Sequence, residues 1–186
     1  GNNAPMPHPG DRDILVRIVA SSVNPVDWKI RAGHLKALLP YHFPFIPGWD
    51  VSGIVVAIGK DVTQFKIGDA VYSRPNILRD GSYAEYIAID EHEAALKPKT
   101  VSHACAASLP LAGITAWDVL VKTAAIKTGD RVLIHAGSGG VGHTVSKSIW
   151  RLRCSNDVNQ KYSAGKIPWC RPGDRLPHPS IRAHSA

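Results

Sequence analysis

The chain has 186 residues, a hydrophobic content of 44% and a formal net charge of +7 at pH 7. That length accommodates one large domain or two small ones, and the hydrophobic content is ordinary for a globular protein. No apolar run approaches the roughly 18 residues of a membrane-spanning helix, and the polar, proline-rich start GNNAPMPHPGDRD lacks the pattern of a secretory signal.

The positive charge is concentrated at the C-terminal end. From Lys147 onward there are eight Lys/Arg and two Asp, whereas residues 1–146 carry fourteen Lys/Arg against thirteen Asp/Glu. Because this body is nearly neutral and has no basic stripe with interleaved aromatic residues, we expect no nucleic-acid binding. The three cysteines form no C-x-x-C pair, which favours a reducing, cytoplasmic setting.

The first hundred residues contain short β-type segments separated by turns. The predicted strands cover residues 14–20, 51–58, 70–72 and 83–89. Between the first two strands, Pro25 marks a turn, and residues 28–39 fit either a short helix or an irregular loop. Short strands at regular intervals indicate a compact all-β or barrel-like domain, which we assign to residues 1–101.

The character of the chain changes near Ser102. The next twenty residues are rich in alanine and leucine and predict helix, with interruptions around Pro110 and Gly113. A β-type run, a glycine-rich turn and a helix-prone segment follow. This order predicts that residues 102–150 are the first part of a doubly wound Rossmann domain. Residues 151–186 contain four prolines and no sustained apolar period, so we expect them not to pack.

The glycine-rich turn is the most informative motif. In RVLIHAGSGGVG, residues 131–142, an apolar run leads directly into Gly137, Gly139 and Gly142, which satisfy G-x-G-x-x-G. The first glycine makes the tight turn, the second lets phosphates approach the backbone, and the third lets the helix pack on the strand. The motif predicts binding of a dinucleotide pyrophosphate. The alternative is a glycine turn that binds nothing.

Five stretches in family order resemble the medium-chain dehydrogenase/reductase superfamily, in its zinc-independent, zeta-crystallin-like quinone oxidoreductase branch. They are SSVNPVDWKIRAG, PFIPGWDVSGIVVAIGKDVTQFKIGDAVYS, GSYAEYIAI, SLPLAGITAWDVL and RVLIHAGSGGVG, and they span roughly residues 8–146. The resemblance implies a mixed α/β fold, in which a GroES-like β-barrel domain packs against a Rossmann domain. It also implies an oxidoreductase that transfers hydride from NADPH, or alternatively NADH, to a small quinone or activated enone, in a parent that is a homo-oligomer.

The resemblance also bears on zinc. Zinc-dependent relatives place a cysteine ligand just after the first strand, where this chain has Asn24, and carry Gly-His-Glu where it has Gly48-Trp49-Asp50. With thiolate and imidazole both replaced, we expect no zinc site and no other metal. Asp50 is expected to be a hydrogen-bonding partner inside the barrel rather than a general acid.

The resemblance implies site residues, although none is assigned as catalytic. Asn24 would donate a hydrogen bond near the nicotinamide or the substrate oxygen, Trp28 would form a stacking wall of the substrate site, and Thr115 would contact the nicotinamide. The pyrophosphate would lie on Gly137, Ser138, Gly139, Gly140, Val141 and Gly142. Structural alternatives stay open: Asn24 as a turn residue, Trp28 as core packing, and Thr115 bonding within its own helix.

The C-terminal tail departs from the family pattern. Permitted codons for this tail, read one base later, translate as GAATTSTRNTALVKSLGADRVIDYRT, which resembles the second strand and helix of the family's Rossmann domain. We therefore hypothesise a reading-frame shift between about Val145 and Arg153. Two functional interpretations follow: an NAD(P)H-dependent quinone or enone reductase, or a truncated, non-catalytic GroES-like fragment that binds no cofactor.

Overall fold

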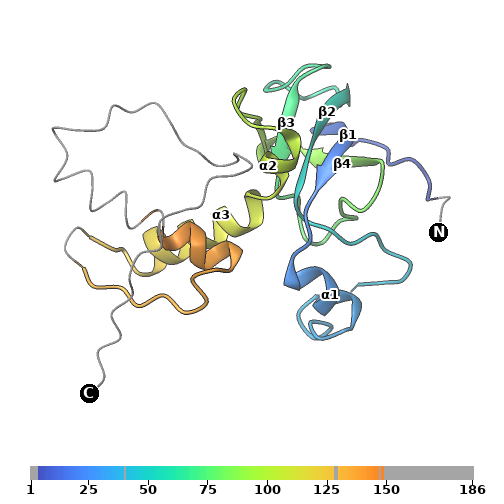
Figure 1. Ribbon diagram of the computed structural model, residues 1–186. Coiled ribbons are helices and arrows are strands. Elements are labelled where there is room, and N and C mark those ends of the chain that lie inside the picture. Colours follow the sequence, from blue (N-terminus) through green and yellow to red (C-terminus); the bar gives the residue numbers. More distant parts are fainter. Residues whose placement is uncertain (1–3, 40, 128–129, 147, 149–186) are drawn as a thin grey trace.

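The computed structural model describes residues 4–39, 41–127, 130–146 and 148, and it consists of a β-sheet unit from which helices lead away (Figure 1). The strands are β1 (Asp13–Ser21), β2 (Val51–Ile58), β3 (Ala70–Ser73), β4 (Tyr86–Asp90) and β5 (Ala94–Leu96). The helices are α1 (Pro25–Arg31), α2 (His103–Ala107) and α3 (Pro110–Trp117), with a 3-10 turn at Glu91–Glu93 and a π-helical turn at Asp118–Thr123. Among the described residues, no helix has the length and apolar character required to cross a membrane.

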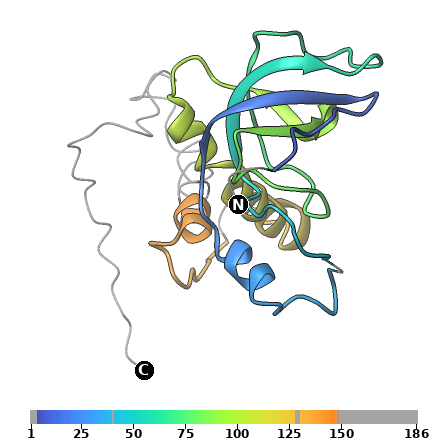
Figure 2. The same ribbon diagram turned by 90° about the vertical axis from the view of Figure 1, so that its right-hand side faces the viewer.

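The five strands form one antiparallel sheet in the order β4-β1-β2-β3-β5. The long strands β1 and β2 curve strongly, so the sheet curls into a half-barrel (Figure 2). The predicted strands at residues 14–20 and 51–58 are confirmed, and the first residues of each strand are buried. The strand predicted over 83–89 begins only at Tyr86.

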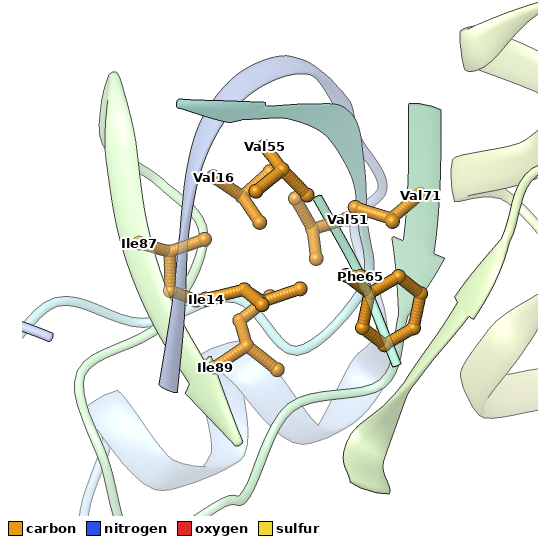
Figure 3. Close-up of a cluster of buried hydrophobic side chains, with 8 residues drawn as sticks. All are labelled: Ile14, Val16, Val51, Val55, Phe65, Val71, Ile87 and Ile89. Carbon is orange, nitrogen blue, oxygen red and sulfur yellow. The ribbon is translucent and has the colours of Figure 1, made fainter. Parts of the chain in front are cut away.

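The core of the β unit lies on the inner face of this curl (Figure 3). It contains eight buried apolar side chains: Ile14, Val16, Val51, Val55, Phe65, Val71, Ile87 and Ile89. Ile14 pairs with Ile89 across the β1–β4 ladder, and both side chains are 0% exposed. Burying each such side chain contributes roughly 1.5–3 kcal/mol, so this cluster is the main source of stability of the β unit.

Two local predictions for the helices were wrong. Pro25 does not mark a turn but occupies the first turn of α1, where its fixed φ suits a helix start and its missing N–H leaves no donor unsatisfied. The interruption predicted at Gly113 is also absent. The helical region breaks only at Ser108 and Leu109, and Pro110 then begins α3. The first error concerns a proline that starts a helix, and the second a glycine that the helix accommodates.

The Rossmann part that the sequence predicts over residues 102–150 is not clearly shown by the structure. The turn and the helix from residue 140 are present, and Val145 packs with Ala116 and Leu120 in a small second core. The predicted strand is absent over residues 131–134, where Leu133 is 82% exposed. A strand needs a hydrogen-bonded neighbour, and the described residues place none beside this run. The tail and the proposed frame shift at its start lie largely outside the described residues.

Candidate functional site

The site begins at the loop between β1 and α1, where Asn24 is the N-terminal cap of α1. Its backbone is extended, with φ −120° and ψ 152°, and its N–H donates to Asp27 Oδ2 at 2.6 Å. The Asp27 carboxylate therefore accepts a hydrogen bond from a backbone N–H at the start of the helix. Its negative charge is also stabilised by the positive end of the helix dipole. This local geometry fixes where the Asn24 side chain emerges.

The carboxylate of Asp50 gathers three hydrogen bonds from two parts of the chain. Oδ2 accepts from Asn24 Nδ2 at 2.7 Å and from Ser22 Oγ at 2.8 Å. Oδ1 accepts from the backbone N–H of Leu111, in the first turn of α3, at 2.7 Å. Asp50 is 1% exposed, and this burial raises the pKa of its carboxyl group. The three hydrogen bonds lower the pKa, but by less than burial raises it. Asp50 is thus a buried acceptor that joins the β unit to α3.

A second buried carboxylate lies in the same region. Asp27, 4% exposed, accepts the phenolic hydrogen of Tyr83 on Oδ2 at 2.6 Å. Its Oδ1 is buried and has no hydrogen-bond partner within the described residues. Burial and this hydrogen bond raise the pKa of Tyr83, so the phenol stays protonated at neutral pH. Sequence analysis missed this pair because its members are far apart in the chain and belong to no shared motif.

A pocket of ≈ 330 Å³ lies between the β unit and α3. Its lining residues are Val26, Arg74, Ile77, Leu111, Ile114, Thr115 and Asp118. Thr115 therefore lies where the β unit and the second part of the chain meet, although its hydroxyl donates to Leu111 O at 2.7 Å within α3. Arg74 is the cation of this lining.

Trp28 is not part of this lining. Its residue is 47% exposed, its ring meets His34 edge-on with centroids 5.5 Å apart, and Lys29 Nζ lies 5.8 Å from its centroid. Such exposure does not fit the alternative of core packing either. The role predicted for Trp28 as a wall of the substrate site stays a prediction.

The glycine-rich turn packs on the helix that carries Thr115. A Cβ on Gly140 would lie 3.4 Å from Ala112 Cβ, and Val141 packs against the small second core. Gly142 is constrained most tightly, because a Cβ there would lie 2.3 Å from Ala136 O. The packing of the following helix on a strand, which the motif predicted for its third glycine, is not seen, because the run in front of the turn forms no strand.

A buried tryptophan occupies the position where zinc-dependent relatives carry a histidine ligand. Trp49 is 0% exposed, and its Nε1 has no hydrogen-bond partner in the described residues. Across the described ranges, no group of three or more His, Cys, Asp or Glu side chains is placed to hold a metal ion. The expectation that the protein works without zinc stays a prediction.

The comparisons with known proteins agree with this architecture. Residues 10–99 match the alcohol dehydrogenase GroES-like domain. The chloroplastic quinone-oxidoreductase homolog of Spinacia oleracea is 44% identical over 143 residues, which are 74% of this chain and 44% of that protein. The chain belongs to the medium-chain dehydrogenase/reductase superfamily. It lies in the quinone oxidoreductase and alkenal reductase branch, as the sequence motifs predicted.

Further members of the superfamily show the same partial coverage. The chloroplastic NADPH-dependent alkenal/one oxidoreductase of Arabidopsis thaliana is 41% identical over 176 residues, 91% of this chain and 45% of that protein. A mycobacterial protein solved in complex with NADPH superposes with a TM-score of 0.73 at 35% identity, covering 81% of this chain and 45% of that one. The chain thus spans less than half the length of these relatives. Because the two plant relatives are named chloroplastic, the cytoplasmic location stays a prediction.

Proposed function

We propose that the protein containing this chain is an NAD(P)H-dependent oxidoreductase that reduces a quinone or an activated enone without zinc. The observation that carries the proposal is the pocket, which is lined by Val26 of α1, by Arg74 next to β3 and by Thr115 of α3. Relatives named as quinone and alkenal oxidoreductases support the same class of reaction.

The residues present fit a dinucleotide in part. The turn at Gly137–Gly142 is the segment that would hold the pyrophosphate, and at Gly142 it leaves no room for a side chain, because a Cβ there would lie 2.3 Å from Ala136 O. Thr115 would contact the nicotinamide end. When bound, NADPH supplies the hydride. The residues that would hold the adenosine ribose correspond to the family's second strand, which lies outside the described residues.

The pocket lining suits a flat, weakly polar acceptor. Val26, Ile77 and Ile114 provide apolar surface for an aromatic or enone ring. Arg74 can donate hydrogen bonds to a carbonyl oxygen that gains negative charge, and such a bond strengthens in an apolar site. No metal is needed for this step, because delocalisation in the quinone or enone carries much of the charge.

A second function is favoured by one observation. The run ahead of the glycine-rich turn forms no strand in the described residues, and Val132 and Leu133 are 38% and 82% exposed. If residues 131–134 do not pair with a neighbouring strand, the chain would be a non-catalytic GroES-like fragment that binds no cofactor.

Two measurements separate the candidates. Purified chain, treated with EDTA, is titrated with NADPH, and NADPH oxidation is then followed with 1,4-naphthoquinone or 3-buten-2-one as acceptor. We expect micromolar NADPH affinity but little turnover for this chain, and zinc-independent turnover for the full-length parent. Absence of NADPH binding at millimolar concentration would favour the non-catalytic fragment. Parent turnover that disappears with EDTA and returns with zinc would contradict the zinc-free proposal.

A further inference from the structure

The loop that follows β3 supplies two of the residues that line the pocket. Arg74 stands directly after the last residue of β3, and Ile77 lies three residues further along the chain. Neither residue belongs to a helix or a strand, so no regular hydrogen-bond ladder fixes where their side chains lie. The shape of this side of the pocket therefore depends on what holds the loop.

Two contacts tie this loop to the β unit, one on each side of Ile77. Before it, the N–H of Asn76 donates to Glu93 Oε2 at 3.0 Å. After it, both terminal nitrogens of Arg79 donate to the carboxylate of Asp13. These hydrogen bonds fix where the loop starts and ends. They do not fix the direction of the peptide carbonyl between them.

The carbonyl of Ile77 is held by Tyr41, from the long connection between α1 and β2. The phenolic hydroxyl of Tyr41 donates a hydrogen bond to this carbonyl oxygen. The ring of Tyr41 stacks on Phe45, with centroids 4.9 Å apart and planes at 25°, and its centroid lies 6.1 Å from that of the buried Trp49. Two aromatic neighbours therefore restrict the ring and aim its hydroxyl at Ile77.

The charge of Arg74 also acts on Tyr41. Burial raises the pKa of Tyr41, and the positive charge of Arg74 lowers this pKa by a smaller amount. A raised pKa keeps the phenol protonated at neutral pH, as its role as a hydrogen-bond donor requires. Tyr41 is thus coupled to both lining residues of the loop, to Ile77 by a hydrogen bond and to Arg74 electrostatically.

We propose that Tyr41 is a positioning residue, which shapes the acceptor side of the pocket through Ile77 and Arg74 without touching the ligand. The inference rests on the proposed function for the identity of the ligand but not for the contact itself. Tyr41, Arg74 and Ile77 all lie outside the five stretches that resemble the family, so the sequence motifs assigned them no role. This part of the pocket would therefore tune which quinone or enone fits.

Tyr41→Phe tests the contact directly, because it keeps the stacked ring and removes only the hydroxyl. In the labelled full chain without ligand, the carbonyl ¹³C signal of Ile77 should move upfield, since the carbonyl loses a hydrogen bond that deshields it. Tyr72→Phe is the matched control, because Tyr72 is also half-buried but lies on β3 and outside the pocket lining. It should leave the Ile77 signal unchanged. An unshifted Ile77 signal in Tyr41→Phe would overturn the proposal.

The coupling to Arg74 has a separate readout. In a chain that carries ¹³C at the tyrosine Cζ, a pH titration gives the pKa of Tyr41. Arg74→Met should raise this pKa further, because the positive charge that lowers it is removed. Arg17→Met removes an equal charge from the separate groove along β1 and should leave the pKa of Tyr41 unchanged. Equal Tyr41 pKa values in the two variants would contradict the coupling.

Calorimetric titration with 1,4-naphthoquinone measures the consequence for binding. Tyr41→Phe should weaken quinone binding about fivefold, the effect expected for one lost hydrogen bond, while Tyr72→Phe leaves the affinity unchanged. The affinity for NADPH should not change in either variant. A general loss of structure in Tyr41→Phe would weaken both ligands, and that outcome, like an unchanged quinone affinity, would overturn the proposal.

Phe45→Leu replaces Tyr41→Phe if the latter does not fold. It keeps the hydroxyl but removes the ring on which Tyr41 stacks, so the Ile77 signal and the quinone affinity should change in the same directions. The two spectroscopic readouts need no ligand. If the unmodified chain fails to bind quinone, that result counts against the proposed function, and the Ile77 signal and the Tyr41 pKa decide on the role of Tyr41.

Discussion

At the scale of single residues, the buried carboxylates do most to organise the site. Asp27 accepts hydrogen bonds from the Asn24 N–H at the start of α1 and from the Tyr83 hydroxyl, while Asp50 accepts from Asn24 and from the first turn of α3. The sequence indicated Asn24 and Asp50 as members of the site region, because they stand where zinc relatives have other residues. It gave no sign of the Asp27–Tyr83 contact or of the orientation of the Asn24 amide, since both depend on how distant segments pack.

One residue-scale prediction concerns Asp13, which is 7% exposed and bonded by both terminal nitrogens of Arg79 at 2.9 and 2.7 Å. The Arg79 hydrogen bonds lower the pKa of Asp13, more than burial raises it. A lowered folded-state pKa stabilises the protein above the unfolded value of about 3.9, and this stability is lost as the pH falls through the folded value. Asp13→Asn should therefore cost about 2 kcal/mol at pH 7 and progressively less below pH 4.

Urea unfolding at pH 7 and pH 3 measures this difference. Asp11→Asn is the matched control, because its ion pair with Lys60 is exposed, with 64% and 71% of the two side chains accessible. Exposed pairs contribute about 1 kcal/mol or less. Equal losses for the two variants at pH 7, or a loss for Asp13→Asn that grows with acid, would contradict the assignment.

A second residue-scale prediction concerns Arg74, the cation that lines the pocket. Arg74→Met should weaken binding of 1,4-naphthoquinone about tenfold, because a charged hydrogen-bond donor to the carbonyl is lost. Calorimetric titration measures the affinity. Arg17→Met is the control, since Arg17 lines a separate groove along β1 and should leave quinone affinity unchanged. Equal affinities in the two variants would remove Arg74 from the proposed site.

At the scale of elements, prediction succeeded where one local pattern determined the outcome. Short apolar runs bounded by turn residues located β1 and β2. Prediction failed for residues 131–134, whose apolar run is typical of a central parallel strand but forms a strand only beside a partner. It also failed at Pro25, since a proline after a polar residue is equally suited to a turn and to the first turn of a helix.

The element-scale prediction concerns the turn that ends at Gly142. A Cβ there would lie 2.3 Å from the carbonyl oxygen of Ala136, so Gly142→Ala should destabilise the turn and the following helix by about 1–3 kcal/mol. The His143 N–H, which donates to Gly139 O at 2.8 Å, should then exchange faster. Gly113→Ala is the control, because its nearest neighbour would be 3.7 Å away and alanine favours a helix by roughly 0.5–1 kcal/mol. A Gly142→Ala chain with unchanged His143 exchange would contradict this reading.

At the scale of the whole molecule, the chain combines a well-packed β unit with a second part whose apolar side chains are exposed. Trp117 is 60% exposed and Leu133 82%. In the curated relatives, which are about twice as long as the matched region, the corresponding part belongs to a larger protein. Large apolar side chains that are exposed in this way favour association when they lie together.

We therefore expect the purified chain to self-associate in a concentration-dependent manner. Sedimentation velocity over a hundredfold range of concentration measures this, and the double variant Trp117→Lys/Leu133→Lys should shift the distribution toward monomer. Ile67→Lys is the control, because Ile67 is 63% exposed on a turn of the β unit. A chain that stays monomeric throughout, or associates equally in all variants, would show that this surface does not drive association.

The most direct test of the central claim is the titration of the chain with NADPH, followed by amide NMR. If the turn at Gly137–Gly142 and the pocket beside Thr115 belong to one cofactor site, NADPH should bind with micromolar affinity, perturb the amides of both segments together, and bind far more weakly to Gly142→Ala. The assignment would be contradicted by an absence of binding at millimolar NADPH, or by binding that leaves the amides of one or both segments unperturbed. Either result would leave a GroES-like unit without a cofactor site.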